Sequence, residues 1–397
     1  MATIKGTSGN DHLKGTDEDD RLYGLGGRDT LDGGGGDDLL DGGDGNDVYL
    51  VDSEGDAIDD SGGRDAVVAT QAYYALGAGL ENLTLRGSWF EVQGDGNVLA
   101  NVIRNDRDGG GAWMDGADGN DTLLGGSGWD VFSFSQGSGN YGHDVVDGGA
   151  GDDGIRVGTH SAVVVDFRDG TVSGGGTAGS GSVSFENIEH AAGGAFDDLL
   201  VANDAGIALY GGDGDDTLRG GAGDDHLASD NDGTDAPQSP FVAGNDRVYG
   251  GAGNDSIVTA GGNDTLDGGA GDDRLEGGGG NDTLYWQASD SRVDGGSGND
   301  TLRIKSGSLD LTAIDNAIIE DVETVNMTNG ADNRLTLREQ DILDLSTSTD
   351  TLKVLGTAGD SVNIVGSYVD EGVASGYHRY GVGAATLLVD TDIASVG

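Results

Sequence analysis

Apolar side chains recur at every ninth position along the most regular stretch of the chain, residues 241–303. In each nine-residue unit, Gly stands at position 4, Asp at position 6 and an aliphatic residue at position 8, and only residues 286–294 lack the Gly and the Asp. Gly adopts turn conformations that other residues resist, and three residues suit a short strand whose middle side chain faces inward. The pattern therefore predicts a turn and a strand in each unit, and two units form one coil.

Stacked coils place residues from units two apart beside each other. The inward apolar ladder predicted for this stretch is Val248, Ile257, Leu266, Leu275, Leu284, Val293 and Leu302. The same geometry places Asp246 beside Asp264, and Asp255 beside Asp273. Two carboxylates about 4 Å apart repel each other by about 4 kcal/mol at an effective dielectric constant of 20. We therefore expect the coils to close only when a cation lies between the layers.

The donors available to this cation are carboxylate and turn carbonyl oxygens. Calcium tolerates irregular all-oxygen sites, whereas magnesium requires a small octahedron and retains water. The chain has no Cys and only six scattered His, so it lacks the usual ligands of zinc and copper. The sequence predicts several calcium ions, held by Asp at position 6. Asp also forms turns without a metal, but turns do not require it at every ninth position. Asn often stands at position 5 where other units have a second Asp, so position 5 is expected to contribute its backbone.

Units of this kind also occur in residues 6–50, 107–156 and 193–228. With the long stretch, eighteen units keep Asp at position 6. The predicted metal ligands are Asp11, Asp20, Asp29, Asp38, Asp47, Asp121, Asp130, Asp144, Asp153, Asp198, Asp216, Asp225, Asp246, Asp255, Asp264, Asp273, Asp282 and Asp300.

The unit resembles the G-G-x-G-x-D-x-U-x nonapeptide of repeats-in-toxin (RTX), or haemolysin-type, calcium-binding proteins. The resemblance implies a calcium-loaded parallel β-roll. Residues 51–106, which contain the segments LGAGLENLTLRG and GNVLANVI, resemble the non-repeat segment that often follows an RTX block. Residues 304–397 resemble the C-terminal region of type I secreted RTX proteins and adhesins, whose uncleaved secretion address corresponds here to residues 384–397. A domain that caps the open edge of the roll is a compatible alternative.

We therefore expect an all-β fold of parallel β-roll blocks, β-rich interludes and a β-rich C-terminal cap. The expected segments are a first roll block 1–50, an interlude 51–106, a second block 107–156, an interlude 157–192, the main roll 193–303 and a capping or secretion region 304–397. Both prolines lie in residues 229–240 of the main roll, which predicts a surface loop there.

The charge of the chain limits its partners. The 397 residues include 79 Gly, 72 Asp plus Glu and 20 Lys plus Arg, which gives a formal net charge of -52. Such a charge disfavours nucleic acid and anionic membranes as partners, and no apolar run approaches the roughly 18 residues of a membrane span. Acidic chains are often disordered, but here the acids follow a fixed period. No cleavable signal peptide is visible, so export is expected to use another address.

The resemblance implies export by the type I secretion machinery of Gram-negative bacteria to the extracellular medium or the cell surface. A Gly-rich acidic chain is expected to be unfolded where calcium is scarce, and calcium outside the cell is expected to drive its folding. We expect no enzymatic activity, since His-Glu-x-x-His and Gly-x-Ser-x-Gly motifs are absent. Two alternatives stay open: a calcium-dependent adhesin with a cell-surface or polysaccharide partner, and an enzyme of the alginate epimerase or lyase type.

Overall fold

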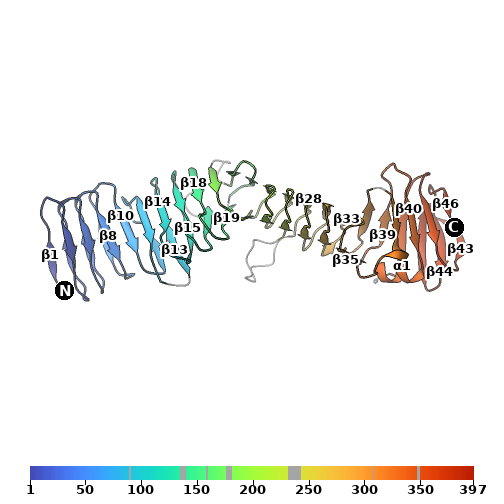
Figure 1. Ribbon diagram of the computed structural model, residues 1–397, viewed down its shortest axis with the longest axis horizontal. Helices are drawn as coiled ribbons and strands as arrows, with labels where there is room; N and C mark the ends of the chain where they lie inside the picture. Colours follow the sequence, from blue (N-terminus) through green and yellow to red (C-terminus); the bar gives the residue numbers. More distant parts are fainter. Residues whose placement is uncertain are drawn as a thin grey trace. The chain divides into compact units, whose positions relative to one another are not determined.

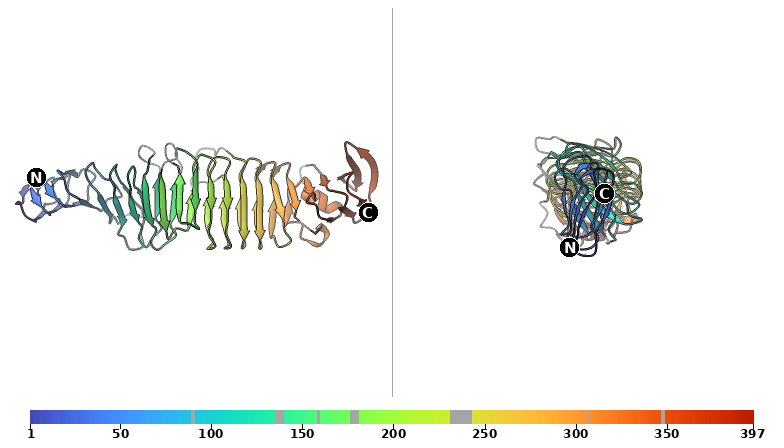
Figure 2. Two further views of the ribbon diagram at one scale, coloured as in Figure 1. Left: turned by 90° about the horizontal axis from the view of Figure 1, so that it is seen from above. Right: turned by 90° about the vertical axis from the view of Figure 1, so that its left-hand side faces the viewer.

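The computed structural model describes residues 1–88, 91–134, 140–157, 160–175, 181–230, 243–305, 307–346 and 349–397. The chain forms two compact units, Met1–Ala195 and Phe196–Gly397, and in each of them short strands of successive coils lie side by side (Figures 1 and 2). The predicted all-β fold and parallel β-roll are confirmed. Most of the predicted 229–240 loop lies outside the described residues, which resume at Ala243. The division into six sequence segments stays a prediction.

In the unit Met1–Ala195, parallel strands line two sides of the coil. One side contains β2 (His12–Lys14), β5 (Thr30–Asp32), β8 (Val48–Val51), β10 (Ala66–Ala69), β12 (Asn82–Leu85), β14 (Val102–Asn105), β16 (Thr122–Leu124), β18 (His143–Asp147) and β22 (Ser182–Glu186). The other side contains the sheet β1 (Thr3–Lys5), β3 (Arg21–Tyr23), β6 (Leu39–Asp41) and β9 (Ala57–Asp59), followed by β11 (Tyr73–Ala75), β13 (Glu91–Asp95), β15 (Gly111–Asp115), β17 (Val131–Phe134), β19 (Gly154–Val157) and β23 (His190–Ala192). The two-residue strands β4 (Gly26–Gly27) and β7 (Asp44–Gly45) pair between turns, and β20 (Val163–Asp166) and β21 (Thr171–Gly174) add an antiparallel ribbon to β22.

The unit Phe196–Gly397 repeats this arrangement. One side contains β24 (Leu199–Val201), β26 (Thr217–Arg219), β28 (Arg247–Ala252), β30 (Thr265–Ala270), β33 (Thr283–Trp286), β36 (Thr301–Ile304), β39 (Thr324–Asn326), β41 (Thr351–Leu355) and β45 (Ala385–Asp390), to which β44 (Tyr377–Val382) and β43 (Val369–Ala374) add in antiparallel fashion. The other side contains β25 (Ala208–Tyr210), β27 (His226–Ala228), β29 (Ser256–Val258), β31 (Arg274–Glu276), β34 (Arg292–Asp294) and β38 (Ile319–Glu320), and a separate sheet contains β37 (Ser308–Asp310), β40 (Arg334–Leu337), β42 (Ser361–Ile364) and β46 (Ser395–Val396). The strands β32 (Gly279–Gly280) and β35 (Ser297–Gly298) pair between turns.

Helical structure is confined to the C-terminal region of the described chain. It consists of the 3-10 turn η2 (Leu311–Ala313) and the helix α1 (Glu339–Leu345). No helix in the described residues has the length and apolar character needed to span a membrane. Residues 304–397 are otherwise β-rich, as expected, and their last strands β45 and β46 pair with β41 and β42.

The inward ladder is the core of each coil. Leu266 lies between Val248 and Leu284 in the paired strands β28, β30 and β33, and all three side chains are fully buried. The backbone confirms that two nine-residue repeats form one coil. The Thr265 N–H donates to the Asp246 carbonyl of the neighbouring coil (2.9 Å), and the Thr283 N–H donates to the Asp264 carbonyl (2.8 Å). The predicted apolar ladder is therefore confirmed.

Glycine at positions 2 and 4 of the unit has the left-handed backbone that the turn requires. In the unit that begins at Gly33, φ is +86° at Gly34 and +114° at Gly36, whereas Gly35 between them has no such angle. An added Cβ at Gly34 would collide with the Thr16 carbonyl of the previous coil, but at Gly35 the nearest atom would lie 3.6 Å away. The turn therefore requires glycine at two positions and tolerates a side chain at the third.

This difference gives a matched pair of variants. We expect Gly34→Ala to lower the free energy of unfolding by about 1–2 kcal/mol, because a left-handed angle is costly for a residue with a Cβ. We expect Gly35→Ala to leave it unchanged or raise it by up to about 1 kcal/mol. Urea unfolding of both variants in saturating calcium measures the two effects, and equal losses would contradict the assignment.

Candidate metal centre

The aspartates at position 6 form a ladder along the turns. In most of them, the backbone N–H donates to the Oδ1 of the aspartate one coil further along the chain. Asp246 donates in this way to Asp264, Asp264 to Asp282, and Asp282 to Asp300. The N···Oδ1 distance is 2.8 Å in each case. The predicted juxtaposition of aspartates two units apart is therefore present. A hydrogen bond from the backbone of one aspartate to the side chain of the other holds each pair together.

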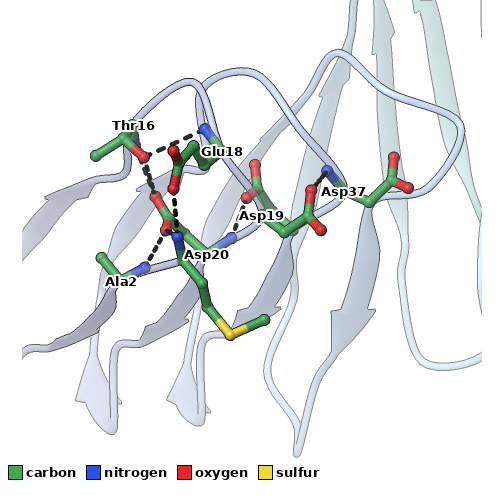
Figure 3. Close-up of polar contacts among 8 residues, drawn as sticks. Ala2, Thr16, Glu18, Asp19, Asp20 and Asp37 are labelled. Atoms are coloured by element: carbon green, nitrogen blue, oxygen red, sulfur yellow. Dashed lines mark hydrogen bonds and ion pairs between the residues drawn. The ribbon is translucent and has the colours of Figure 1, made fainter.

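The same ladder runs through the N-terminal coils. The Asp11 N–H donates to Asp29 (2.7 Å), Asp29 to Asp47 (2.8 Å) and Asp20 to Asp38 (2.7 Å). Figure 3 shows the first rung of one row, where the Ala2 N–H and the Thr16 hydroxyl both donate to the Asp20 carboxylate. Where another residue replaces Asp at position 6, its backbone N–H can still donate to the ladder. The Ala112 N–H, for example, donates to Asp130 Oδ1 (2.7 Å).

The second carboxylate oxygen, Oδ2, is in most cases buried without a hydrogen-bond partner. Among the described residues, thirteen of the eighteen predicted ligands have such an oxygen: Asp29, Asp38, Asp47, Asp121, Asp144, Asp153, Asp216, Asp246, Asp255, Asp264, Asp273, Asp282 and Asp300. In Asp11, Asp20, Asp130 and Asp225, Oδ2 accepts a hydrogen bond from its own turn. A buried unpaired oxygen is costly, so these atoms are the available metal donors.

In many of these turns, among them those of Asp255 and Asp282, this oxygen points toward the glycine at position 1 of its own turn. A side-chain carbon on Gly277 would lie 2.5 Å from Asp282 Oδ2 and 2.8 Å from the Gly295 carbonyl oxygen of the next coil. Gly250 has the same surroundings, formed by Asp255 and the next coil's Gly268. A carboxylate oxygen and a carbonyl oxygen from successive coils therefore converge where no side chain fits. This all-oxygen donor set fits calcium.

Burial makes the charged form of these carboxylates unfavourable. It raises the pKa of Asp216 to about 9 and the pKa of Asp144 to about 8, and nearby aspartates raise both pKa values further. Burial likewise raises the pKa of Asp255 and Asp282 to about 7. Desolvation and like charge both act in this direction. A bound divalent cation would supply the positive charge that lets these groups ionise.

Position 5 forms a second ladder with the opposite direction. The Asn263 N–H donates to Asn245 Oδ1 of the previous coil, and the Asn281 N–H donates to Asn263 Oδ1, each over 2.9 Å. Aspartate takes the same part, since the Asp215 N–H donates to Asp197 Oδ1 (3.0 Å). Asn and Asp side chains at position 5 thus join successive coils by hydrogen bonds, and the expectation that position 5 offers the metal its backbone stays a prediction.

Residues outside the predicted units extend the ladder of position 6. The Asp38 N–H donates to Asp56 (3.0 Å), the Asp47 N–H to Asp65 (2.6 Å), and the Asn101 N–H to Asp121 (2.7 Å). These positions lie outside the nine-residue units recognised in the sequence. The ladder also joins residues that are further apart in the sequence than the usual 18 positions. The Asp216 N–H donates to Asp246 Oδ1 (2.8 Å), which is 30 residues away.

Three glutamates form the last rung of three rows, and the sequence analysis missed all of them. The Asp65 N–H donates to Glu81 (2.8 Å), the Asp153 N–H to Glu189 (2.9 Å) and the Asp300 N–H to Glu323 (2.9 Å). A shared pattern could have identified them: each glutamate follows a buried aliphatic residue and precedes another buried apolar residue by two positions, as in LENL, IEHA and VETV.

Two sites gather a third carboxylate. Ligand oxygens of Asp230, Asp246 and Asp264 lie within 4.8 Å of one another, as do those of Asp47, Asp60 and Asp65. Asp230 is held in place by the N–H groups of Gly244 (3.1 Å) and Ala260 (3.0 Å). These two sites have more negative charge than an ordinary rung of the ladder.

Comparison with known proteins identifies the repeat. A family model described as the RTX calcium-binding nonapeptide repeat matches residues 3–31, 14–49, 108–140, 136–158, 208–233, 243–266, 258–285 and 267–302. Among solved structures, the extracellular lipase LipA from Serratia marcescens matches with 13% identity and a TM-score of 0.15, over 82% of this chain and 42% of that chain. The chain thus spans less than half of that lipase, and a likeness of this size carries no argument. No curated protein matches the chain.

Replacing one ladder carboxylate by its amide tests the metal assignment. We expect Asp264→Asn to keep the hydrogen bond from Asp246, because the amide oxygen replaces Oδ1, but to lose the charge that a cation needs. Isothermal titration should show a lower calcium stoichiometry than in the parent protein. The exposed Asp392 provides the control Asp392→Asn, which removes the same charge elsewhere. Unchanged stoichiometry in Asp264→Asn would contradict the assignment.

Protons are expected to compete with calcium. Asp255 and Asp282, whose pKa lies near 7 in the folded chain, keep a proton at pH values where the unfolded chain has released it, because the reference pKa is about 3.9. The metal-free fold therefore loses stability as pH rises from about 4 to 7, while calcium requires the ionised form. The calcium concentration for half-saturation should rise when the pH is lowered from 8 to 6. Calcium titrations at several pH values measure it, and equal affinities would contradict the burial of these groups.

Proposed function

Because the chain belongs to the RTX calcium-binding repeat proteins, we propose that it is a secreted, non-enzymatic β-roll protein whose folding is driven by extracellular calcium. Its calcium sites lie at the turns, between successive coils. The function of the roll is to become a rigid body only after the chain has reached a medium that contains calcium.

The row of buried, unpartnered Oδ2 atoms carries this proposal. Each rung between Asp246 and Asp300 has one such atom at the same corner of the coil, and the Oδ1 atoms are already bonded to backbone N–H groups. Without a cation, the folded chain must either protonate these groups or bury their charges, and both are costly at neutral pH. Calcium that binds only the folded chain therefore stabilises it by mass action.

The glycine content supports an unfolded metal-free state. Ordering Gly costs more backbone entropy than ordering any other residue, and the chain contains 79 of them. Each coil offsets this cost with a thin core: β30, with six residues, and β31, with three, each bury a single aliphatic side chain, Leu266 and Leu275. An unfolded acidic chain inside the cell and a folded one outside would suit export through a narrow channel.

The resemblance of residues 304–397 to the C-terminal region of type I secreted proteins supports the proposed route. The segment 384–397 would serve as the secretion address while the chain is unfolded. In the folded chain, its strands β45 and β46 complete two sheets, so the same segment can cap the roll after export. The proposal of a non-enzymatic protein rests on the absence of the protease and lipase motifs from the sequence.

A calcium titration tests the proposed folding switch. Starting in excess chelator, we expect circular dichroism to show little strand signal, and calcium to produce the strand signal together with a smaller scattering radius. Magnesium at the same concentration is the control and should produce neither change, because it retains its water. A complete strand signal in excess chelator would contradict the proposal.

A further inference from the structure

One side of the unit Met1–Ala195 contains a break in its sheet. The sheet β1-β3-β6-β9 ends at β9, and the next sheet on this side begins at β11. On the opposite side, β8, β10 and β12 of the same coils pair without interruption. Within the described chain, β9 pairs only with β6, and β11 only with β13. Two parallel strand edges thus face each other without being bonded.

A cavity of about 520 Å³ lies between these edges and is lined by residues of both strands, including Ile58 of β9 and Tyr73 and Tyr74 of β11. This volume is typical of ligand pockets. Leu80 and Gln71 also line the cavity. We name this feature the β9–β11 slot.

The slot leaves part of the core uncovered. Ile58 occupies the inward position of β9, in register with Leu40 of β6. Leu40 is fully buried, whereas Ile58 is only partly buried. Gln71 adds a buried side-chain oxygen, Oε1, that lacks a hydrogen-bond partner among the described residues. An added strand would cover the apolar side chain and could satisfy this oxygen.

The backbone of both edges is oriented to accept such a strand. The Ala57 N–H donates to the Asp38 carbonyl on the β6 side (2.8 Å), and the Gln93 N–H of β13 donates to the Ala72 carbonyl (2.8 Å). Successive residues of a strand direct their peptide groups to alternate neighbours. The N–H and C=O of Ile58 and of Tyr73 therefore point toward the slot.

We propose that the β9–β11 slot binds an extended, basic segment of a partner polypeptide as an added parallel strand. Open strand edges recruit extended chains by backbone hydrogen bonds. The exposed Glu54 lines the slot and would attract a lysine or arginine side chain of the segment, while an apolar residue of the segment would cover Ile58. A second copy of this chain is a poor occupant, because its net charge is also -52.

Two synthetic peptides of equal charge separate strand addition from simple charge attraction. The first alternates lysine and valine over seven residues, and the second replaces each valine by proline, which lacks the N–H needed for a ladder. With the calcium-loaded full chain at physiological salt, we expect the first peptide to bind about tenfold or more tightly than the second, because several backbone hydrogen bonds are lost. Isothermal titration measures both affinities.

Hydrogen exchange identifies the place of binding. The first peptide should protect the Ile58 and Tyr73 amides and leave those of β26 unchanged. Glu54→Lys should weaken binding severalfold, whereas the charge-matched control Glu186→Lys at an exposed position of β22 should not. Tyr73→Pro removes a slot-directed N–H and should weaken binding in a chain whose calcium titration is unchanged.

Three outcomes would overturn the proposal. Equal affinity of the two peptides would show charge attraction alone. Binding without protection of β9 and β11 would place the peptide elsewhere on the acidic surface. A neutral oligosaccharide that protects the same amides, when the lysine–valine peptide does not bind, would assign the slot to a glycan stacked on Tyr73.

Discussion

The structure depends on the burial of one carboxylate per turn directly above another. One oxygen of each carboxylate accepts a backbone N–H from the neighbouring coil, as Asp264 does from Asp246, and therefore joins the coils. The other oxygen is buried without a partner, and it repels the same atom in the next coil. The group that connects the coils thus also destabilises them unless a cation is present. A calcium ion bound between the coils would remove this repulsion, which is why the proposed function makes calcium part of the fold.

Much of this arrangement could be predicted from the nine-residue period. A period fixes which residues recur at the same corner, so the pairing of Asp29 with Asp47 and the stacking of Leu266 on Val248 followed from counting alone. The chemistry of the donors then favoured calcium. What the period does not contain is the direction of each hydrogen bond. The side chains at position 5 accept from the following coil and those at position 6 from the preceding coil, so the importance of Asn263 could not be seen in the pattern.

The rest of the candidate site was hidden because ladder partners are defined in space. Asp216 meets Asp246 across 30 residues, because the chain between them is longer than the usual spacing, while the hydrogen bond of the ladder is the same. Glu323 replaces aspartate where the turn before it is no longer a Gly-rich hexapeptide, and its longer side chain still reaches the Asp300 N–H. A search for a fixed spacing misses both the Asp216–Asp246 pair and Glu323. A search for a carboxylate between two apolar residues would have identified Glu323.

At one place the end of a carboxylate row coincides with an interruption of a sheet. One row continues from Asp47 through Asp65 to Glu81, and on that side β8, β10 and β12 stay paired. The other row ends at Asp56, whose N–H turns back to the Ser53 carbonyl of its own turn (3.3 Å), and Ala72 stands before β11 where a carboxylate would be needed. With no acceptor at this corner, β11 does not dock on β9. At this corner the missing rung of the aspartate ladder and the open strand edge thus occur together.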